Sequence, residues 1–350
     1  MSAPHPATTN PPSPSDPPGG GPSGPAPGGG PARLRALIHT APGVRETTDL
    51  AELRVASADE QTLVWVDIVD GDQVLVDELA ACLGIHPLVA EDILERNQRA
   101  KIERTGDAIH IVMFGLIYDG ELEATEVDIV LGPRFLLTSH DPGWDPHELV
   151  NLRRGADAYL SDGADYLLWA IVDGLVDGYF PVFDRLGDEI DDLQDDVIRR
   201  PTAWVVERLF QVRRDLLKIR HAVSPQREIF NQLTNRDEAL VTAERILYFR
   251  DVYDHLIRLT DELDSYRELV TTTLDAYLST VNNNLSDVMK RLTAVTVILA
   301  GVGAVAGIFG MSEAALAFQA GEGSGFWIVA VLVTALGAAA AYYFHRIGWL

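Results

Sequence analysis

Cysteine is almost absent from this chain of 350 residues. Its single copy, Cys82, excludes an intramolecular disulfide and fits a reducing compartment. Basic residues are also scarce, since 28 Lys and Arg oppose 52 Asp and Glu and leave a net charge of -24. Because phosphate binding requires a cationic surface, this balance argues against a nucleic-acid partner. The acidity favours the attraction of cations, or it simply keeps a soluble region dispersed.

Recognisable catalytic motifs are absent as well. The chain has no glycine-rich phosphate loop, no Gly-x-Ser-x-Gly elbow, no His-Glu-x-x-His segment and no pair of cysteines. His86 and His110 fall in the region that we interpret below as an α/β domain, where a structural role suits both better than a catalytic one. The sequence therefore predicts a protein that is not an enzyme.

Charge is nearly absent from the first 31 residues, which contain eleven Pro, seven Gly and a single charged residue, Asp16. Such a segment cannot bury enough apolar surface to offset the entropy of ordering it, so we expect residues 1–33 to form a disordered leader. The leader lacks the basic start and the apolar core of a signal peptide. It also lacks the arginines of a transit peptide, because the first Arg of the chain is Arg33.

Two segments near the C-terminal end contain no charged residue at all, 292–312 and 323–344. Each is about long enough to cross a hydrocarbon core of ~30 Å as a helix. We therefore expect the lipid bilayer as a partner and two transmembrane helices. An external loop at 313–322 would join them, and a short tail at 345–350 would follow.

Cationic residues flank this expected hairpin, because Lys290 and Arg291 precede it and Arg346 follows it. The loop between the two helices carries only acidic charges, Glu313 and Glu322. By the positive-inside rule, both ends of the hairpin face the cytoplasm. The sequence thus predicts a multi-pass protein of the plasma (inner) membrane with both termini in the cytoplasm.

The region 34–157 mixes strand and helix patterns. Short runs of apolar and β-branched residues indicate strands, and a Gly-Pro pair between the last two runs indicates a hairpin. We expect a compact cytosolic α/β domain, although the order of its strands is not readable from the pattern. The expected strands are 63–68, 108–114, 127–131 and 135–138, and the expected helices lie around 74–83 and 87–95.

Strand patterns stop after this domain, and the region 158–239 is expected to be helical and rich in acids. An apolar helix is expected at 166–176 and an acidic one at 184–199. Three prolines in this half of the chain are expected to break helices or to begin them. They are Pro181, Pro201 and Pro225.

The acidic helix raises the question of a metal site. None of its acids has a His or Cys partner at ligand spacing, so a solvated face that raises the local cation concentration is the better interpretation, and a tight metal site is the alternative. The acids are Asp184, Asp188, Glu189, Asp191, Asp192, Asp195 and Asp196.

Glycine and proline are both absent from residues 226–300, a stretch far longer than a typical globular helix. An unbroken helix from about Leu240 through Phe309 would be roughly 100 Å long and would carry a stalk, 240–291, directly into the first membrane span. Apolar residues recur in it every seven residues, as in a coiled coil. One series is Phe249, Leu256, Leu263, Val270 and Tyr277, and a second is Ile246, Tyr253, Leu274, Val281 and Val288.

A hairpin of two membrane helices cannot enclose a pore by itself, whereas a stalk with an oligomerising seam can bring further copies together. Small and hydroxyl-bearing residues fall along one face of the first span, as the lining of a water-filled pathway requires. Close helix packing is the alternative, because Gly303-x-x-x-Gly307 is a small-xxx-small motif. A hairpin that only anchors a soluble domain is a second alternative. The stripe consists of Ser286, Thr293, Thr296, Ala300, Gly303, Gly307 and Gly310.

Three consecutive asparagines, with Asn283 at the centre, lie just before the first span. Asparagine is a poor helix former, so another requirement should account for the run. A polar pore mouth is one interpretation, and simple surface polarity is the other.

Four segments occur in order before the C-terminal hairpin: 85–94 (IHPLVAEDIL), 248–255 (YFRDVYDH), 287–293 (DVMKRLT) and 306–311 (AGIFGM). In this combination the chain resembles the CorA family of divalent-cation (magnesium and cobalt) channels, from about residue 34 to its end. The resemblance implies an α/β domain on a long stalk helix that continues as the pore-lining span. It also implies that the second span lies outside the first, in a funnel-shaped homopentamer.

The resemblance further implies Mg²⁺ influx driven by the membrane potential, with Co²⁺ or Ni²⁺ as lesser substrates. Mg²⁺ would then be both the transported and the regulatory ion, with no other cofactor. Family members close when cytosolic Mg²⁺ binds carboxylates between subunits, which correspond here to Asp92, with Glu91, on one subunit and Asp251 on the next. Such a site suits Mg²⁺, which keeps most of its waters and takes only one or two carboxylates.

One departure from the family pattern concerns selectivity. The family ends its first span in Gly-Met-Asn, whereas this chain has Gly310-Met311-Ser312. A Ser hydroxyl still hydrogen-bonds to a hydrated ion, but it is shorter than Asn and makes a wider, weaker ring. Glu313 and Glu322 either compensate as an acidic ring at the entrance or merely keep the loop hydrated. Two alternatives therefore stay open: a Zn²⁺ transporter of the ZntB-like branch, and a poorly conducting membrane-anchored sensor of divalent cations.

Overall fold

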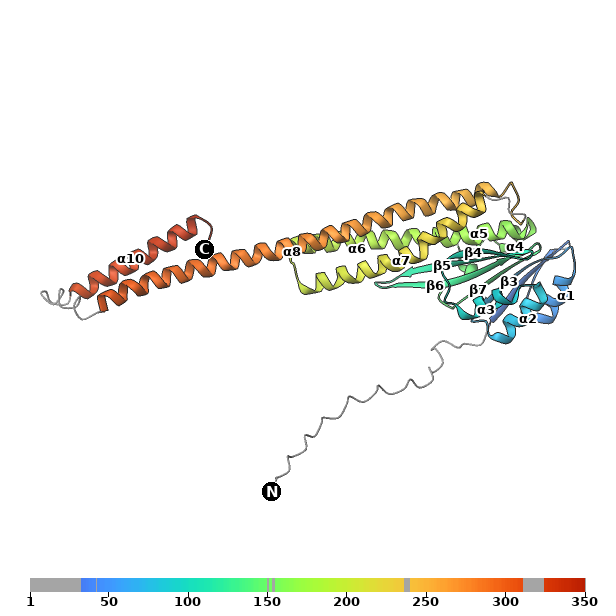
Figure 1. Cartoon of the computed structure of the whole chain (residues 1–350), viewed down its shortest axis with the longest axis horizontal. Helices are drawn as coiled ribbons and strands as arrows, with labels where there is room; N and C mark the ends of the chain where they lie inside the picture. Colours follow the sequence, from blue (N-terminus) through green and yellow to red (C-terminus); the bar gives the residue numbers. More distant parts are fainter. Residues whose placement is uncertain are drawn as a thin grey trace, which may run out of the picture.

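The computed structural model describes residues 33–41, 43–149, 151–152, 155–235, 240–310 and 324–349. It is elongated, with an α/β domain at one end and a pair of antiparallel helices at the other (Figure 1). One continuous helix connects the two ends. The predicted leader up to residue 32, the external loop at 313–322 with Glu313 and Glu322, and the pair Met311 and Ser312 all lie outside the described residues.

Seven strands form one mixed sheet in the order β2-β1-β3-β7-β6-β5-β4. The central pair β3 and β7 is parallel, and every other neighbouring pair is antiparallel. The four strands expected from the sequence are present, and so is the expected hairpin between β6 and β7. The strands are β1 (Arg33–Thr40), β2 (Gly43–Thr47), β3 (Leu63–Val69), β4 (Lys101–Thr105), β5 (Ala108–Tyr118), β6 (Leu122–Leu131) and β7 (Phe135–His140).

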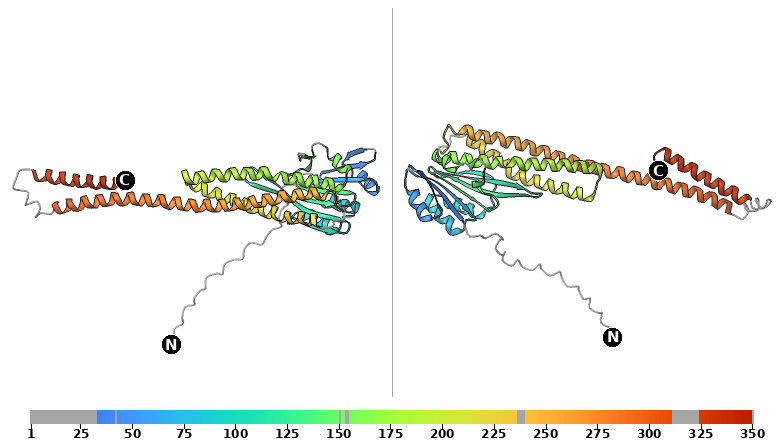
Figure 2. Two further views of the ribbon diagram at one scale, coloured as in Figure 1. Left: turned by 90° about the horizontal axis from the view of Figure 1, so that it is seen from above. Right: turned by 180° about the vertical axis from the view of Figure 1, so that it is seen from behind.

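Helices cover both faces of this sheet (Figure 2). Helices α1 (Leu50–Ala58), α2 (Gln73–Leu83) and α3 (Pro87–Glu95) pack on one face. The other face carries α4 (Ala156–Ser161), α5 (Ala164–Asp177), α6 (Tyr179–Arg199), α7 (Ala203–Asn235) and the first half of α8 (Ile246–Gly310). The 3-10 turn η1 (Pro146–Glu148) precedes α4, and α10 (Ser324–Arg346) ends the described chain.

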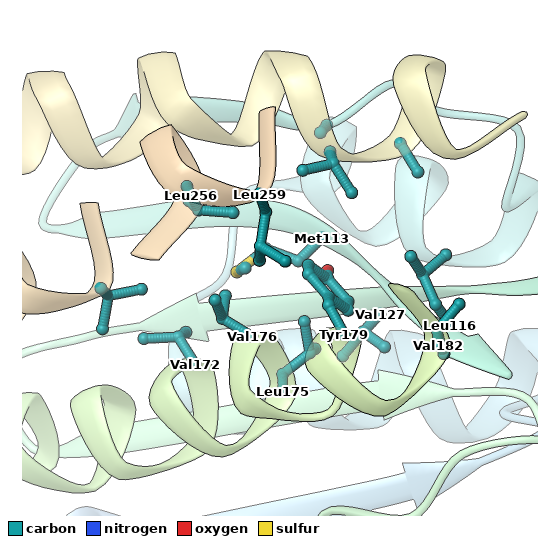
Figure 3. Close-up of a cluster of buried hydrophobic side chains, with 14 of the residues drawn as sticks. Met113, Leu116, Val127, Val172, Leu175, Val176, Tyr179, Val182, Leu256 and Leu259 are labelled. Atoms are coloured by element: carbon teal, nitrogen blue, oxygen red, sulfur yellow. The ribbon is translucent and has the colours of Figure 1, made fainter. Parts of the chain in front are cut away.

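Two separate hydrophobic cores result, one on each face of the sheet. Along β3, the side chain of Trp65 enters the larger core while Val64 and Val66 enter the smaller one. Burial on both faces explains why the central strands are almost continuous apolar runs. In the larger core, Met113 of the sheet and Tyr179 of α6 meet residues of α5 and α8 (Figure 3).

The long helix α8 begins at Ile246, six residues later than the expected stalk at 240. Four members of the first seven-residue series are fully buried against α6 and α7 of the same chain. The prediction of an oligomerising seam was therefore wrong for this series, because helices of its own subunit already cover it. The four buried members are Phe249, Leu256, Leu263 and Val270.

The expected break at Pro225 was also wrong, since this residue lies inside α7. Val223 and Phe230 on either side of it are fully buried, so packing holds the helix together across the lost backbone donor. The side chain of Gln226 donates from Nε2 to the carbonyl of Ala222 over 2.9 Å, in the turn that the proline disturbs. Pro181 lies in the first turn of α6 and Pro201 between α6 and α7, as expected.

Among the described helices, two stretches are long and apolar enough to span a membrane. The stretch Ala164–Arg199, which comprises α5 and α6, has 61% of its most apolar segment buried inside the protein, so it belongs to the core. In the stretch Ile246–Ile308, only 6% of the most apolar segment is buried, so this segment is free to contact lipid or further copies. Helix α10 carries no charge from Ser324 to Phe344 and runs back along the end of α8 (Figure 1).

Candidate ion pathway and metal site

One side of α8 faces α10 in the apolar hairpin. Ala294 is fully buried there, and Ile298, Val302 and Val305 are partly covered. A methyl group placed on Gly337 of α10 would lie 3.5 Å from the Val302 side chain. These residues mark the side of α8 that α10 covers within the subunit.

The stripe of small residues lies on the other side of α8. At about 100° per residue, Thr293, Thr296, Ala300, Gly303 and Gly307 all point away from the residues that meet α10. Each of these five is exposed in the single chain. The stripe is therefore available to a pathway or to neighbouring copies.

The glycines of the stripe are not needed for packing inside the subunit. No other described residue lies within 4 Å of a methyl group placed on Gly303 or on Gly307. The packing interpretation of this motif is therefore wrong for contact with α10. Pore lining, contact between copies and contact with lipid are the interpretations that the geometry leaves.

The structure describes Ser286 and Asn283 near the inner end of the stripe and Gly310 at its outer end. Ser286 is exposed and continues the stripe, while Asn283 is exposed about 60° away around the helix. The asparagine run is fully helical, so α8 passes through it without a break. Gly310 is the last residue of α8, where the stripe ends.

A group of possible metal ligands surrounds Asp251 at the start of α8. Asp251 and His255 are one helical turn apart, and Asp173 of α5 joins them. One ligand atom from each residue lies within 4.8 Å of the other two. The spacing of Asp251 and His255 is visible in the sequence, but the contribution of Asp173 arises only from the packing of α5 on α8.

The charge at this group is unbalanced. Burial, and next the charge of Asp177, raise the pKa of Asp173 to about 6. His255 lies with Nδ1 3.6 Å from the Asp177 carboxylate. Because several carboxylates crowd one imidazole, a divalent cation bound here would relieve their mutual repulsion.

Asp92 and Glu91 lie elsewhere, on α3. The Asp92 carboxylate accepts from Lys101 Nζ over 2.7 Å, and the same ammonium reaches Glu103 at 3.2 Å. Glu91 is exposed on the neighbouring face of α3. The structure places Asp92 and Asp251 in two separate groups of possible ligands, so it does not bring them together within one chain. Their pairing between subunits stays a prediction.

The acids of α6 fit a solvated face. Six of the seven are exposed, and among the described residues α6 contributes none to a group of three possible metal ligands. Glu189 is the exception, because it is partly buried and accepts hydrogen bonds from Arg208 and from the Tyr118 hydroxyl. This acid joins α6 to α7 and to the end of β5.

A buried polar layer lies in the sheet beneath Asp92. His110 contacts Asp128 over 2.8 Å between Nε2 and Oδ1, and Glu126 accepts from the backbone N–H of Gln98 over 3.1 Å. Burial, and next the charge of Asp128, raise the pKa of Glu126 to about 7 from an ordinary value of 4.5. His110 is thus a partner of Asp128 in this layer, and it also belongs to the group of possible metal ligands with Asp92 and Glu103, so its structural role stays a prediction.

The Glu126 carboxyl makes stability depend on pH. It binds its proton more tightly in the folded protein than in the unfolded chain, so stability falls as the pH rises from about 4.5 to about 7. Glu126→Gln keeps an oxygen for Gln98 and removes the charge. We expect it to raise the thermal unfolding midpoint more at about pH 8 than at about pH 5.

Glu123→Gln, at an exposed position of the same strand, is the matched control and should change neither midpoint. An equal effect of both substitutions would contradict this assignment.

A two-faced α/β domain carried on one long helix, whose apolar end pairs with a second uncharged helix, is the architecture of a membrane transport protein. The model of the family "CorA-like Mg2+ transporter protein" matches residues 60–346, and the chain belongs to this family. The match includes the stripe of α8 and both groups of acids around Asp92 and Asp251.

Individual relatives agree with this membership. The cobalt/magnesium transport protein CorA of Thermotoga maritima is 35% identical over 273 residues, which cover 76% of this chain and 78% of the relative. The complete structure of the CorA magnesium transporter from Methanocaldococcus jannaschii superposes with a TM-score of 0.73 at 22% identity, covering 91% of this chain and 99% of the other. The zinc transport protein ZntB of Yersinia pseudotuberculosis is 22% identical over 272 residues, or 75% of this chain and 80% of the relative.

Proposed function

We propose that the chain conducts divalent cations across a membrane, with Mg²⁺ as the principal ion and Co²⁺ or Ni²⁺ as lesser ones. The observation that carries this proposal is the orientation of the α8 stripe, which faces away from α10 and leaves open space over Gly303 and Gly307. Small and hydroxyl-bearing side chains let water and a hydrated ion pass along a helix bundle. The T. maritima relative, a cobalt/magnesium transport protein, supports the choice of ions.

The pathway requires several copies of α8, and we propose a homopentamer. Below the membrane span, α8 exposes a row of large apolar residues at alternating spacings of three and four. This is the heptad pattern of a helix that packs against other helices, and no other described part of the same chain covers it. The row consists of Leu278, Val281, Leu285, Val288 and Leu292. This row, rather than the first seven-residue series that α6 and α7 already cover, would form the contact between copies.

We propose that the hairpin spans the plasma (inner) membrane with both chain termini in the cytoplasm. Lys290 and Arg291 lie where α8 would enter the membrane, and Arg346 lies where α10 would leave it. Cationic residues at both of these positions favour the cytoplasmic side. The α/β domain, the first half of α8 and the acidic α6 would then all be cytosolic.

Regulation by the transported ion is the second part of the proposal. Mg²⁺ would bind at Asp251, supported by Asp173, and would engage Asp92 and Glu91 of a neighbouring copy. For Asp92 to bind the ion, its carboxylate must exchange the Lys101 ammonium for the metal. Bound ions would hold neighbouring subunits together and favour a closed pore, whereas their loss would let the subunits separate.

Ion uptake into proteoliposomes that contain the purified full-length protein tests this function. Mg²⁺, Co²⁺, Ni²⁺ and Zn²⁺ are compared in parallel, each for the parent and for Ser312→Asn. We expect Mg²⁺ uptake by the parent, suppressed when Mg²⁺ is present on the cytosolic side. Zn²⁺ uptake without Mg²⁺ uptake would assign the chain to a zinc transporter like ZntB. Uptake only after Ser312→Asn would indicate a sensor whose pore no longer conducts.

A further inference from the structure

Three polar side chains converge near the carboxyl ends of the parallel strands β3 and β7, both of which α5 contacts. Asp67 lies two residues before the end of β3, His140 ends β7, and His147 comes from the turn η1 that follows. The Asp67 and His140 side chains are almost fully buried, with exposed fractions of 5% and 1%, and His147 is 21% exposed. Ligands commonly bind at the carboxyl ends of neighbouring parallel strands.

The distances within this cluster fit ligands of one metal ion. His147 Nε2 lies 3.5 Å from Asp67 Oδ2, and one atom each from Asp67, Asp145 and His147 lies within 4.8 Å of the others. Ligand bonds of about 2.0–2.2 Å place two ligands of a tetrahedral ion about 3.3–3.5 Å apart. The separation of nitrogen and oxygen is thus that of two atoms bound to the same ion.

The imidazoles of the cluster are incompletely satisfied. Within the described part of the chain, the Nε2 atoms of His140 and His147 are both buried and have no hydrogen-bond partner in good geometry. His140 Nε2 lies 3.3 Å from Asp67 Oδ1, and its Nδ1 contacts the carbonyl of Asp141 over 2.8 Å. A buried ring nitrogen without a hydrogen bond is uncommon and calls for a ligand or an ion.

The groups behind these side chains hold them in place. Thr138 donates its hydroxyl to Asp67 Oδ1 and accepts from Trp65 Nε1 over 3.1 Å, so the carboxylate is fixed from the side opposite to His147. The Trp65 ring stacks on His147 with centroids 4.4 Å apart. Asp145 Oδ1 accepts from the His147 backbone N–H over 2.8 Å, which leaves its other oxygen available. Such outer contacts are typical of metal sites, where they orient the ligands.

We propose that Asp67, Asp145 and His147 form a binding site for a divalent transition-metal ion of the Zn²⁺, Co²⁺ or Ni²⁺ class. His140 would position the Asp67 carboxylate from the buried side. The imidazole ligand disfavours Mg²⁺, which prefers oxygen ligands in octahedral geometry. The site would fasten the turn after β7 onto the sheet, and it is separate from the groups at Asp251 and Asp92.

Metal binding by the full-length protein, stripped with a chelator and kept in detergent, tests this site. Equilibrium dialysis against Co²⁺ gives the number of ions bound per chain, and the visible absorption of Co²⁺ reports a nitrogen-containing site of low coordination number. His147→Gln should remove one equivalent per chain together with its absorption band. His221→Gln, at an exposed position, is the matched control and should remove nothing. His255→Gln should leave the His147 equivalent in place.

Two results would overturn the proposal. One is unchanged Co²⁺ stoichiometry and absorption in His147→Gln, measured in both the parent and the His255→Gln background. The other is X-ray absorption of the Zn²⁺-loaded His255→Gln protein that shows only oxygen ligands. This second measurement needs no substitution near the site, so it decides the question even where His147→Gln fails to fold. Neither depends on whether the protein conducts ions.

Discussion

Gly303→Leu is expected to reduce Mg²⁺ uptake by reconstituted protein to the level of protein-free vesicles. Each copy would place a leucine side chain where no other described residue lies within 4 Å of an added methyl group, on the side of α8 that faces away from α10. In a symmetric bundle every copy contributes one such side chain at the same depth. A ring of leucines both narrows the pathway and excludes water from it.

Gly301→Leu provides the matched control for this substitution. Gly301 also has no neighbour among the described residues within 4 Å of an added methyl group, but it lies about 160° away from Gly303 around the helix. The residue change is identical and the two positions are two residues apart. Both substitutions should therefore affect membrane insertion and helix propensity equally. We expect uptake to persist in Gly301→Leu. Equal loss of uptake in both variants would show that the glycines serve helix packing rather than a pore.

Asp251→Asn is expected to abolish the inhibition of uptake by cytosolic Mg²⁺ while uptake itself persists. The substitution removes the carboxylate that Asp173 and His255 surround at the start of α8, so the regulatory ion loses its central ligand. The same variant should lose the stabilisation that Mg²⁺ confers on the folded protein. For one site this stabilisation amounts to about 2.7 kcal/mol at a concentration of 100 times Kd.

Asp254→Asn is the control for the regulatory site. Asp254 is exposed on the same helix, three residues from Asp251, and belongs to no group of possible ligands among the described residues. Thermal unfolding with increasing Mg²⁺ should show a rising midpoint for the parent and for Asp254→Asn, and a flat one for Asp251→Asn. A rising midpoint in all three proteins would place the regulatory ion somewhere other than Asp251.

The strands that the sequence indicated are those buried on both faces of the sheet. β3 and β7 read as apolar runs because each lies between two cores. β2 and β4 are the edge strands, and only one of their residues, Thr47, is buried, so their sequences contain no such run. Their place in the sheet follows from pairing with distant segments, which the local pattern does not contain.

The seven-residue repeat in α8 was recognised, but its partner was not. A heptad pattern shows that a helix is covered and does not show by what. Phe249 and Leu256 meet α6 and α7 of their own chain, whereas Leu285 and Val288 further along are left exposed. Whether a residue of the repeat is covered depends on how far α6 and α7 extend along α8. That length is a property of the fold and cannot be read from the repeat.

The candidate site could be predicted in part. The stripe of α8 follows from helical spacing alone, and its orientation away from α10 needed the position of the second helix. Asp251 followed from the family resemblance, and His255 lies one turn from it. Asp173 could not be found, since nothing in the sequence states that α5 packs beside the start of α8.

Thiol block of single-cysteine variants tests the central claim, that the small-residue stripe of α8 lines an ion pathway. The chain makes this practical, because Cys82→Ser removes its single cysteine. Thr296→Cys would place a thiol on the stripe, and Val302→Cys would place one on the side that meets α10. A charged methanethiosulfonate reagent should stop Mg²⁺ uptake by the Thr296→Cys protein and leave the Val302→Cys protein active. Block at Val302→Cys with none at Thr296→Cys would contradict the account.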